Sequence, residues 1–407
     1  MQSIIERAQQ LSQQIIDDRR NLHQLPEVGV YLPKTAAYVK RRLSEMGVFH
    51  RGCGIHSEAD RQRALKAGFG DMPDSTGIVA TIGRAGPCLL LRADMDALPI
   101  RETTGLPFAA DSDNGHMCGH DAHAAMLLGA AQLLKEREDE LPGSVKLMFQ
   151  PGEELGYGAR TMVEDGLLNG PKVHAALAIH IMSTVPVGEV HYSTGVASSS
   201  LDTFMIKIQG RGGHSSAPHQ TVDATLIANQ LYTAVNLLAA RETDPASFVT
   251  LNAVIVKCNT ASNVIADSIE LHCGFRTLDV EARNHLLQRL PQIIDHCITA
   301  WRGTYEITQF ATPSTVCDDA FSTTLEPWVA QVVGAENIKK VPPMGGTEDF
   351  GYVSEKVPSM FIQLGAGGPD AYPHHNPNLF LDESVLHKGA ALYANCAFEW
   401  LQSQTGG

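Results

Sequence analysis

Apolar residues follow two different patterns along the chain. In the first half, four short runs are apolar almost throughout, as expected for buried strands: 77–83 (GIVATIG), 88–92 (CLLLR), 145–150 (VKLMFQ) and 175–181 (AALAIHI). Helical periodicity occupies the stretches before and between them: 3–24, 34–47, 122–137 and 159–166. Apolar strands that alternate with helices are typical of a mixed α/β sheet covered on both faces.

The second pattern begins near residue 198. Strands with alternating apolar and polar residues, which predict one solvated face, are expected at 203–209, 248–257 and 268–276. Helical runs at 222–240 and 280–302 separate them, and 305–310 reads as an edge strand. The α/β pattern then resumes at 321–333, 359–364 and 383–404. We therefore predict a main α/β domain made of residues 1–197 and 313–407, with a compact α+β satellite domain, 198–312, inserted in it.

The composition indicates a folded protein and narrows its partners. The chain has 407 residues, of which 43% are hydrophobic and 19% charged, so it is long enough for two domains and too apolar to be disordered. Its net charge of −14 argues against nucleic acid and anionic membranes as partners. The first twenty residues form a charged amphipathic pattern rather than a secretory signal. No window is apolar enough to span a membrane. Eight scattered cysteines without a CxxC pair indicate a reducing compartment, so we expect a cytoplasmic protein.

Chemically active side chains gather near the ends of the apolar strands, where open α/β sheets bind ligands. Cys118 and His120 stand two apart in a glycine-containing turn before a helix. Glu153 and Glu154 follow a buried strand directly, and His180 interrupts another. Thiolate and imidazole are good ligands for zinc and similar divalent ions. Of two adjacent carboxylates, one can bind metal while the other takes a proton from water that the metal activates.

Each feature also has a structural explanation when taken alone. Cys118 and His120 could be a buried thiol and a helix-capping imidazole, and His180 could be a satisfied core histidine. A nucleophilic Cys118–His120 dyad is a competing chemistry, but residues so close in sequence rarely face each other, and the paired acids would have no task. The joint occurrence of cysteine, glutamates and histidines, together with HHNP at 374–377 in a loop rich in glycine and proline, supplies enough ligands for two metals.

Several ordered motifs resemble peptidase family M20, the aminoacylase-type metallopeptidases, and within it the amidohydrolase subfamily that acts on N-acyl amino acids, hippurate and indole-acetyl amino acids. The motifs span nearly the whole chain: RRNLHQLPE (19–27), RADMDALPI (92–100), CGHDAHAAMLLGAA (118–131), FQPGEE (149–154), GRGGHSSAPH (210–219), NVIADS (263–268), GTEDF (346–350) and HHNP (374–377). The resemblance implies an aminopeptidase-like, di-metal catalytic domain and a satellite domain that often mediates dimerisation.

The resemblance also implies roles for individual residues. Cys118 would bridge two divalent ions (Zn, Mn, Ni or Co), and the other ligands would be His120, Glu154, His180 and His375. Glu153 would be the general base and acid. Asp96 would hold a ligand in place. In HHNP the ligand would be His375 rather than His374, because it directly precedes Asn-Pro.

Four further residues would contact the substrate. His214 matches a residue that stabilises the oxyanion, often from the partner subunit of a dimer. Asn263 and Arg276 match positions that grip a substrate carboxylate, and Gly346 lies in a run that would offer backbone amides. Structural explanations stand beside these roles: His214 could be an ordinary loop histidine, and Arg276 could pair with an acid on its own sheet.

The chain departs from the family pattern in two places. Between Gly47 and Thr76 it is longer by roughly a helix and a turn, and Ser57 with Asp60 could cap the extra helix. The segment 48–75 is then either a surface insertion or a cover that narrows the substrate range. At 316–319 the chain reads VCDD, where relatives often carry Asn-Asp.

These observations predict a metal-dependent amidohydrolase that cleaves a small N-acyl or N-aroyl amino acid bearing a carboxylate. A homodimer or higher oligomer formed through the satellite domain is expected. Two alternatives to this function are a different reaction at the same site and a protein that catalyses no reaction. The same site could release ammonia from an activated aminobenzoate-type arene, or the chain could be a binding protein on an inactive scaffold. The presence of all five candidate ligands and of Glu153 argues against the second.

Overall fold

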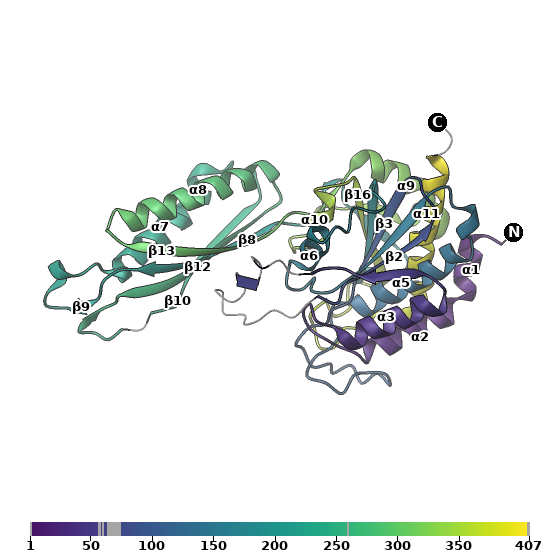
Figure 1. Ribbon diagram of the computed structural model, residues 1–407, viewed down its shortest axis with the longest axis horizontal. Helices are drawn as coiled ribbons and strands as arrows, with labels where there is room; N and C mark the ends of the chain where they lie inside the picture. Colours follow the sequence, from purple (N-terminus) through teal and green to yellow (C-terminus); the bar gives the residue numbers. More distant parts are fainter. Residues whose placement is uncertain (1, 56–57, 59–60, 63–74, 259, 405–407) are drawn as a thin grey trace.

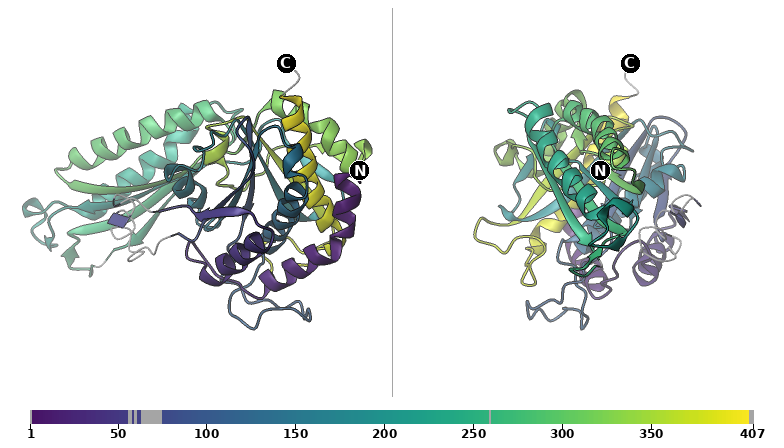
Figure 2. Two further views of the ribbon diagram at one scale, coloured as in Figure 1. Left: turned by 45° about the vertical axis from the view of Figure 1, so that its right-hand side comes forward. Right: turned by 90° about the vertical axis from the view of Figure 1, so that its left-hand side faces the viewer.

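A computed structural model describes residues 2–55, 58, 61–62, 75–258 and 260–404. The described chain forms two parts that lie side by side: a larger α/β part and a smaller α+β part that extends away from it (Figures 1 and 2). Among the described residues, none of the helices has the length and apolar character needed to cross a membrane.

The larger part is built on an eight-stranded mixed sheet in the order β1-β2-β4-β3-β5-β16-β6-β15. Its strands are β1 (Phe49–Gly52), β2 (Ile78–Gly83), β3 (Cys88–Asp94), β4 (Ser144–Gln150), β5 (Ala175–Pro186), β6 (Val190–Tyr192), β15 (Ile338–Lys340) and β16 (Ser359–Gly367). The four central strands, β4, β3, β5 and β16, are parallel. Their carboxyl ends therefore meet at one rim of the sheet.

Helices cover both faces of this sheet. One face packs against α1 (Ile4–Gln10), α2 (Ser12–His23), α3 (Pro33–Glu45), α5 (His120–Lys135), α9 (Asp319–Val333) and α11 (Leu386–Ser403). The other face packs against α6 (Gly158–Glu164) and α10 (Gly351–Ser354). Every residue of β3 and β4 is buried, which explains their uninterrupted apolar sequences, because a strand between two helical layers has no solvated side.

The smaller part is an antiparallel four-stranded sheet in the order β10-β12-β8-β13, with α7 (Ala224–Glu242) and α8 (Val280–Thr299) on one face. Its strands are β8 (Leu201–Gln209), β10 (Val249–Lys257), β12 (Ser268–Thr277) and β13 (Thr304–Thr312). Along β12, residues buried beneath the helices alternate with partly exposed ones. A separate two-stranded pair, β9 (Gly213–His214) and β11 (Val264–Ile265), lies at the end of this part farthest from the large sheet (Figure 1).

The expected mixed α/β fold is confirmed, and the differences are local. The helix expected over 3–24 is divided at Leu11 into α1 and α2. The strand β1, at the start of the 48–75 segment, was missed, because three of its four residues are exposed and it carries no apolar pattern. The capping residues Ser57 and Asp60 of the expected extra helix lie outside the described residues.

Candidate metal centre

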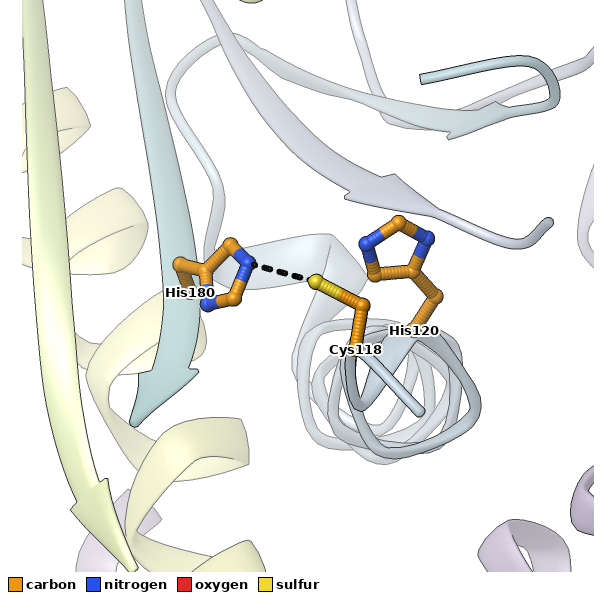
Figure 3. A group of neighbouring side chains, drawn as sticks. All are labelled: Cys118, His120 and His180. Atoms are coloured by element: carbon orange, nitrogen blue, oxygen red, sulfur yellow. Dashed lines mark hydrogen bonds between the residues drawn. The ribbon is translucent and has the colours of Figure 1, made fainter. Parts of the chain in front are cut away.

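The five residues expected to bind metal come together at the carboxyl rim of the central strands. They form two groups, and within each group the candidate ligand atoms lie within 4.8 Å of one another. The first group is Cys118, His120 and His180, and the second is Cys118, Glu154 and His375. Cys118 belongs to both, so the arrangement has the form of two neighbouring sites that share one thiol. Figure 3 shows the sulfur of Cys118 between the imidazole rings of His120 and His180.

The turn that carries Cys118 and His120 depends on the glycine between them. Gly119 precedes α5 with φ +85, in the left-handed region that favours glycine. A Cβ atom at this position would lie 2.6 Å from a methyl group of Ile181 and 3.0 Å from one of Leu381. Glycine is thus required both for the backbone angle and for the space, and it lets the sulfur and the imidazole approach the same point from the start of the helix.

The surroundings of His120 fit a metal ligand. Its Nδ1 lies 3.2 Å from Oδ1 of Asp96, while its buried Nε2 has no hydrogen-bond partner among the described residues. The nearest carboxylate oxygens to Nε2, on Asp94 and Glu154, are 3.8 and 3.9 Å away. A buried imidazole with one nitrogen held by a carboxylate and the other unpaired is the arrangement found around metal-binding histidines. Burial raises the pKa of the Cys118 thiol to about 12, so its thiolate form requires a cation beside it.

Asp96 also organises the paired glutamates. Its two carboxylate oxygens accept the backbone N–H groups of Glu153 and Glu154, at 3.2 and 3.1 Å. One carboxylate therefore fixes both the His120 ring and the turn that follows β4. The supporting role expected for Asp96 stays a prediction, and these hydrogen bonds are compatible with it.

The two histidines of HHNP have different environments. Both ring nitrogens of His374 are occupied, one by the carbonyl of Cys118 (3.1 Å) and one by the N–H of Ser183 (3.2 Å). His375 is exposed, and its Nε2 lies 3.2 Å from Oε1 of Glu154. It adopts φ +65, rare for a residue other than glycine, and its N–H donates to the carbonyl of Met117. This geometry suits a metal ligand better at His375 than at His374, and the assignment of His375 stays a prediction.

Glu153 faces a different set of neighbours from Glu154. Burial, reinforced by the carboxylates of Glu348 and Asp349, raises its pKa well above the usual range. Those two acids pair with Arg92, which is fully buried at the end of β3 and also pairs with Asp94 at 2.8 Å. A carboxyl group whose pKa is raised above its ordinary value takes up a proton more readily, which suits it to general acid–base catalysis.

A cavity of about 1180 Å³ lies between the two parts of the molecule and contains the candidate centre. Cys118, both glutamates and the histidines 180, 374 and 375 line it. Arg276 of β12 reaches it from the smaller part and donates a hydrogen bond to Oγ1 of Thr347, next to Gly346, which also lines the wall. Much of the remaining lining is apolar, including Tyr31, Leu155, Met182, Met205 and Met344.

Two of the expected substrate residues lie elsewhere in this chain. His214 is exposed on β9 and accepts hydrogen bonds from Ser216, and Asn263 is exposed on the neighbouring strand connection. The backbone carbonyl of Asn263 accepts the N–H of Ser215, so the two segments are held together. The strand β9, which carries His214, lies at the end of the smaller part farthest from the large sheet (Figure 1), and neither His214 nor Asn263 is among the residues that line the cavity.

The sequence interpretation left several residues around the centre without a role. Arg92, Asp94, His123, Glu348 and Asp349 are all buried and bonded to one another or to the sheet. A sign of this was present in the sequence, since Arg92 follows four apolar residues in a buried strand and GTEDF places two acids before a phenylalanine. The apolar cavity lining gave no sign, because single apolar residues in loops follow no pattern.

The mixed α/β sheet carries a candidate ligand set around Cys118 at its carboxyl rim, beside the buried Glu153, and the smaller part of the molecule faces it across the cavity. Together these features define a two-part metallohydrolase architecture. The comparisons with known proteins agree. The profile of peptidase family M20/M25/M40 matches residues 90–399, so the chain belongs to this family and is a hydrolase of C–N bonds.

The relatives are similar over nearly their whole length. An N-acetyl-L-cysteine deacetylase of Bacillus subtilis is 34% identical over 97% of this chain and 89% of its own. An indole-acetyl (IAA)-amino acid hydrolase of Arabidopsis thaliana is 32% identical over 94% of this chain and 84% of its own. A solved structure of a dinuclear metal-binding peptidase of family M20 from Bacillus subtilis superimposes with a TM-score of 0.73, at 29% identity, over 96% of this chain and 99% of that one.

Proposed function

We propose that the protein hydrolyses the amide bond of small N-acyl or N-aroyl amino acids, using two divalent ions held by Cys118, His120, His180, Glu154 and His375. The observation that carries the proposal is the pair of ligand groups that share Cys118 beside the buried Glu153. The relatives that act on N-acetylcysteine and on IAA-amino acids support the substrate class. Zinc, manganese, nickel and cobalt all suit this mixed ligand set, and we propose a cytoplasmic location for the enzyme.

Glu153 would move the protons of the reaction. When bound, the ions would polarise the scissile carbonyl and make the attacking water more acidic. Glu153 takes the proton from that water and later donates it to the nitrogen of the leaving amine. Asp96 holds the His120 ring and the turn of Glu153 and Glu154 in place during the reaction, through its contact with Nδ1 of His120 and its hydrogen bonds from the two backbone N–H groups.

The cavity would hold the two ends of the substrate, the carboxylate and the acyl group, at different parts of its wall. The guanidinium of Arg276, already oriented by Thr347, grips the carboxylate of the amino acid. The backbone around Gly346 offers amides beside it. The apolar side chains that line the remaining wall provide a surface for the acyl group.

We also propose a homodimer formed through the smaller part. Its edge strand β10 exposes three consecutive apolar residues, Val254, Ile255 and Val256, and α7 next to it exposes Tyr232 and Leu237. An unpaired edge with apolar side chains is a preferred site for pairing with another chain. In such a dimer, His214 and Asn263 would reach the partner's cavity, which accounts for their distance from their own.

A product assay tests the proposed reaction. Purified, metal-loaded enzyme is incubated separately with N-acetyl amino acids, with N-benzoyl amino acids and with aminobenzoates, and both free amino acid and ammonia are measured. Release of a free amino acid from the first two classes is expected. Release of ammonia from the aminobenzoates alone would replace this function with the arene reaction. No turnover of any class by metal-loaded enzyme would leave the binding-protein alternative.

A further inference from the structure

Strands β3 and β5 separate immediately beneath the candidate metal centre. They pair from Leu89 opposite Ala175 to Arg92 opposite Ala178, and the pairing ends there. Each keeps its other neighbour beyond this point: β3 stays paired with β4 to Asp94, and β5 stays paired with β16 past His180. Beyond Ala178, the part of the chain that the structure describes provides no paired strand along this edge of β5, and buried backbone N–H groups on such an edge need other acceptors.

The hydroxyl of a tyrosine takes the place of the first direct hydrogen bond beyond the paired part of β3 and β5. In a parallel ladder with Arg92 opposite Ala178, the next bond would join the N–H of Ile179 to the carbonyl of Arg92. Instead, the N–H of Ile179 donates to the hydroxyl of Tyr393 at 3.0 Å, and that hydroxyl donates to the carbonyl of Arg92 at 2.6 Å. Tyr393 is fully buried on α11. Its oxygen therefore fixes how far the two strands stand apart at the start of the split.

Two histidines bind the next N–H groups along the same edge. The N–H of Ile181 donates to Nε2 of His123 at 2.8 Å, and the N–H of Ser183 donates to Nε2 of His374 at 3.2 Å. Because a backbone N–H can only donate, both imidazoles must accept at Nε2 and carry their proton on Nδ1. His123 then donates from Nδ1 to Asp94 on β3, and His374 donates from Nδ1 to the carbonyl of Cys118.

The candidate ligand His180 lies between the first two of these anchored positions. Its Nδ1 lies 2.7 Å from the carbonyl of Ile181, which leaves Nε2 pointing to the sulfur of Cys118 at 3.7 Å (Figure 3). The backbone on both sides of His180 is thus held by side chains from α11 and α5, and these side chains are also tied to β3.

We propose that Tyr393, His123 and His374 are positioning residues that replace strand β3 along the edge of β5 and so set the place of His180 in the metal centre. The inference rests on the proposed two-ion function. It assigns the three side chains to the site made by Cys118, His120 and His180. It gives them no role in the site made by Cys118, Glu154 and His375.

Tyr393→Phe tests the proposal against a matched control, Tyr192→Phe. Tyr192 is as buried as Tyr393 but lies at the end of β6 in the large sheet, and its hydroxyl bonds to Glu326, away from the centre. Each apoprotein is titrated with Co²⁺, followed by the absorption of the bound ion, and with Zn²⁺ in competition with a chelator. Removal of a side chain that orients a metal ligand typically weakens metal binding about 10–100-fold. We expect a loss of this size at one of two sites in Tyr393→Phe, a changed Co²⁺ spectrum, and two unaltered sites in Tyr192→Phe.

Hydrogen exchange of the apoprotein gives a second measurement that needs no metal. The peptide containing Ile179 should exchange faster in Tyr393→Phe than in the control. Unchanged affinity at both sites and unchanged exchange would overturn the proposal. If Tyr393→Phe does not fold, His123→Leu decides in the same assays, with Ile181 as the reporter. Wild-type protein that binds fewer than two ions would instead contradict the proposed function, so the two failures are distinguishable.

Discussion

Glu153 and Glu154 are adjacent in sequence, yet their surroundings give them different chemistry. Glu154 faces His375 and shares a ligand group with Cys118, whereas Glu153 faces two further acids and has a raised pKa. In the turn that follows β4, the side chains of adjacent residues point in different directions. One carboxylate can therefore bind an ion while the other transfers protons.

Replacing Glu153 separates these roles. We expect Glu153→Gln to lower kcat about 10²–10⁴-fold, the usual contribution of general acid–base catalysis, while the bound metal stays the same. Glu154→Gln is the contrasting variant and should lose metal. Turnover and metal content are measured on the same preparations. Near-normal turnover in Glu153→Gln would remove the assignment of this residue.

Arg276 is expected to recognise the substrate carboxylate. Loss of a charge-assisted hydrogen bond costs about 1.5–3 kcal/mol, so Arg276→Ala should lower kcat/KM about 10–150-fold for N-acyl amino acids. The corresponding amino acid amides lack the carboxylate and serve as the control, and wild type and variant should cleave these equally. An equal loss on both substrates would mean that Arg276 acts on the fold or on the reaction centre.

At the scale of elements, the sequence was informative where burial is regular. Strands β3, β4 and β5 and helices α5, α7 and α8 follow their apolar patterns, because each buries whole faces. The exposed strand β1 and the division of the first helix at Leu11 carry no such pattern. At the site, Arg92 and its buried acid partners were left without a role, whereas the five candidate ligands and Glu153 could be named from the sequence. Tyr393 could not, because its position on α11 shows only in three dimensions.

Gly119 tests how the turn before α5 places its two ligands. Gly166 has a similar φ of +82 but open space around it, so Gly166→Ala isolates the backbone cost of about 1–2 kcal/mol. Gly119→Ala adds the clash with Ile181 and Leu381, typically worth a further 1–3 kcal/mol or so. We expect the larger loss of unfolding free energy, and loss of metal, only in Gly119→Ala. Equal stability losses with metal retained would show that the crowding is relieved without moving the ligands.

At the scale of the whole molecule, each cavity is expected to be completed by a second copy of the chain. We expect the wild type to sediment as a dimer. The variant Ile255→Lys/Leu237→Glu, which places charges on β10 and α7, should sediment as a monomer and lose turnover, because His214 and Asn263 no longer reach a partner's cavity. Val280→Glu places a charge on an exposed apolar position of α8 and should remain dimeric. A fully active monomer would contradict this assembly.

The number of ions that activity requires tests the shared-thiol, two-ion centre most directly. Apoprotein stripped by a chelator is reconstituted with increasing Zn²⁺ or Mn²⁺, and the release of amino acid from an N-acyl amino acid is measured together with bound metal. Activity should reach its plateau at two ions per chain, and Cys118→Ala should lose both metal binding and activity at the same total metal concentration. Full activity in the metal-free protein, or two tightly bound ions in Cys118→Ala, would contradict the shared-thiol, two-ion centre.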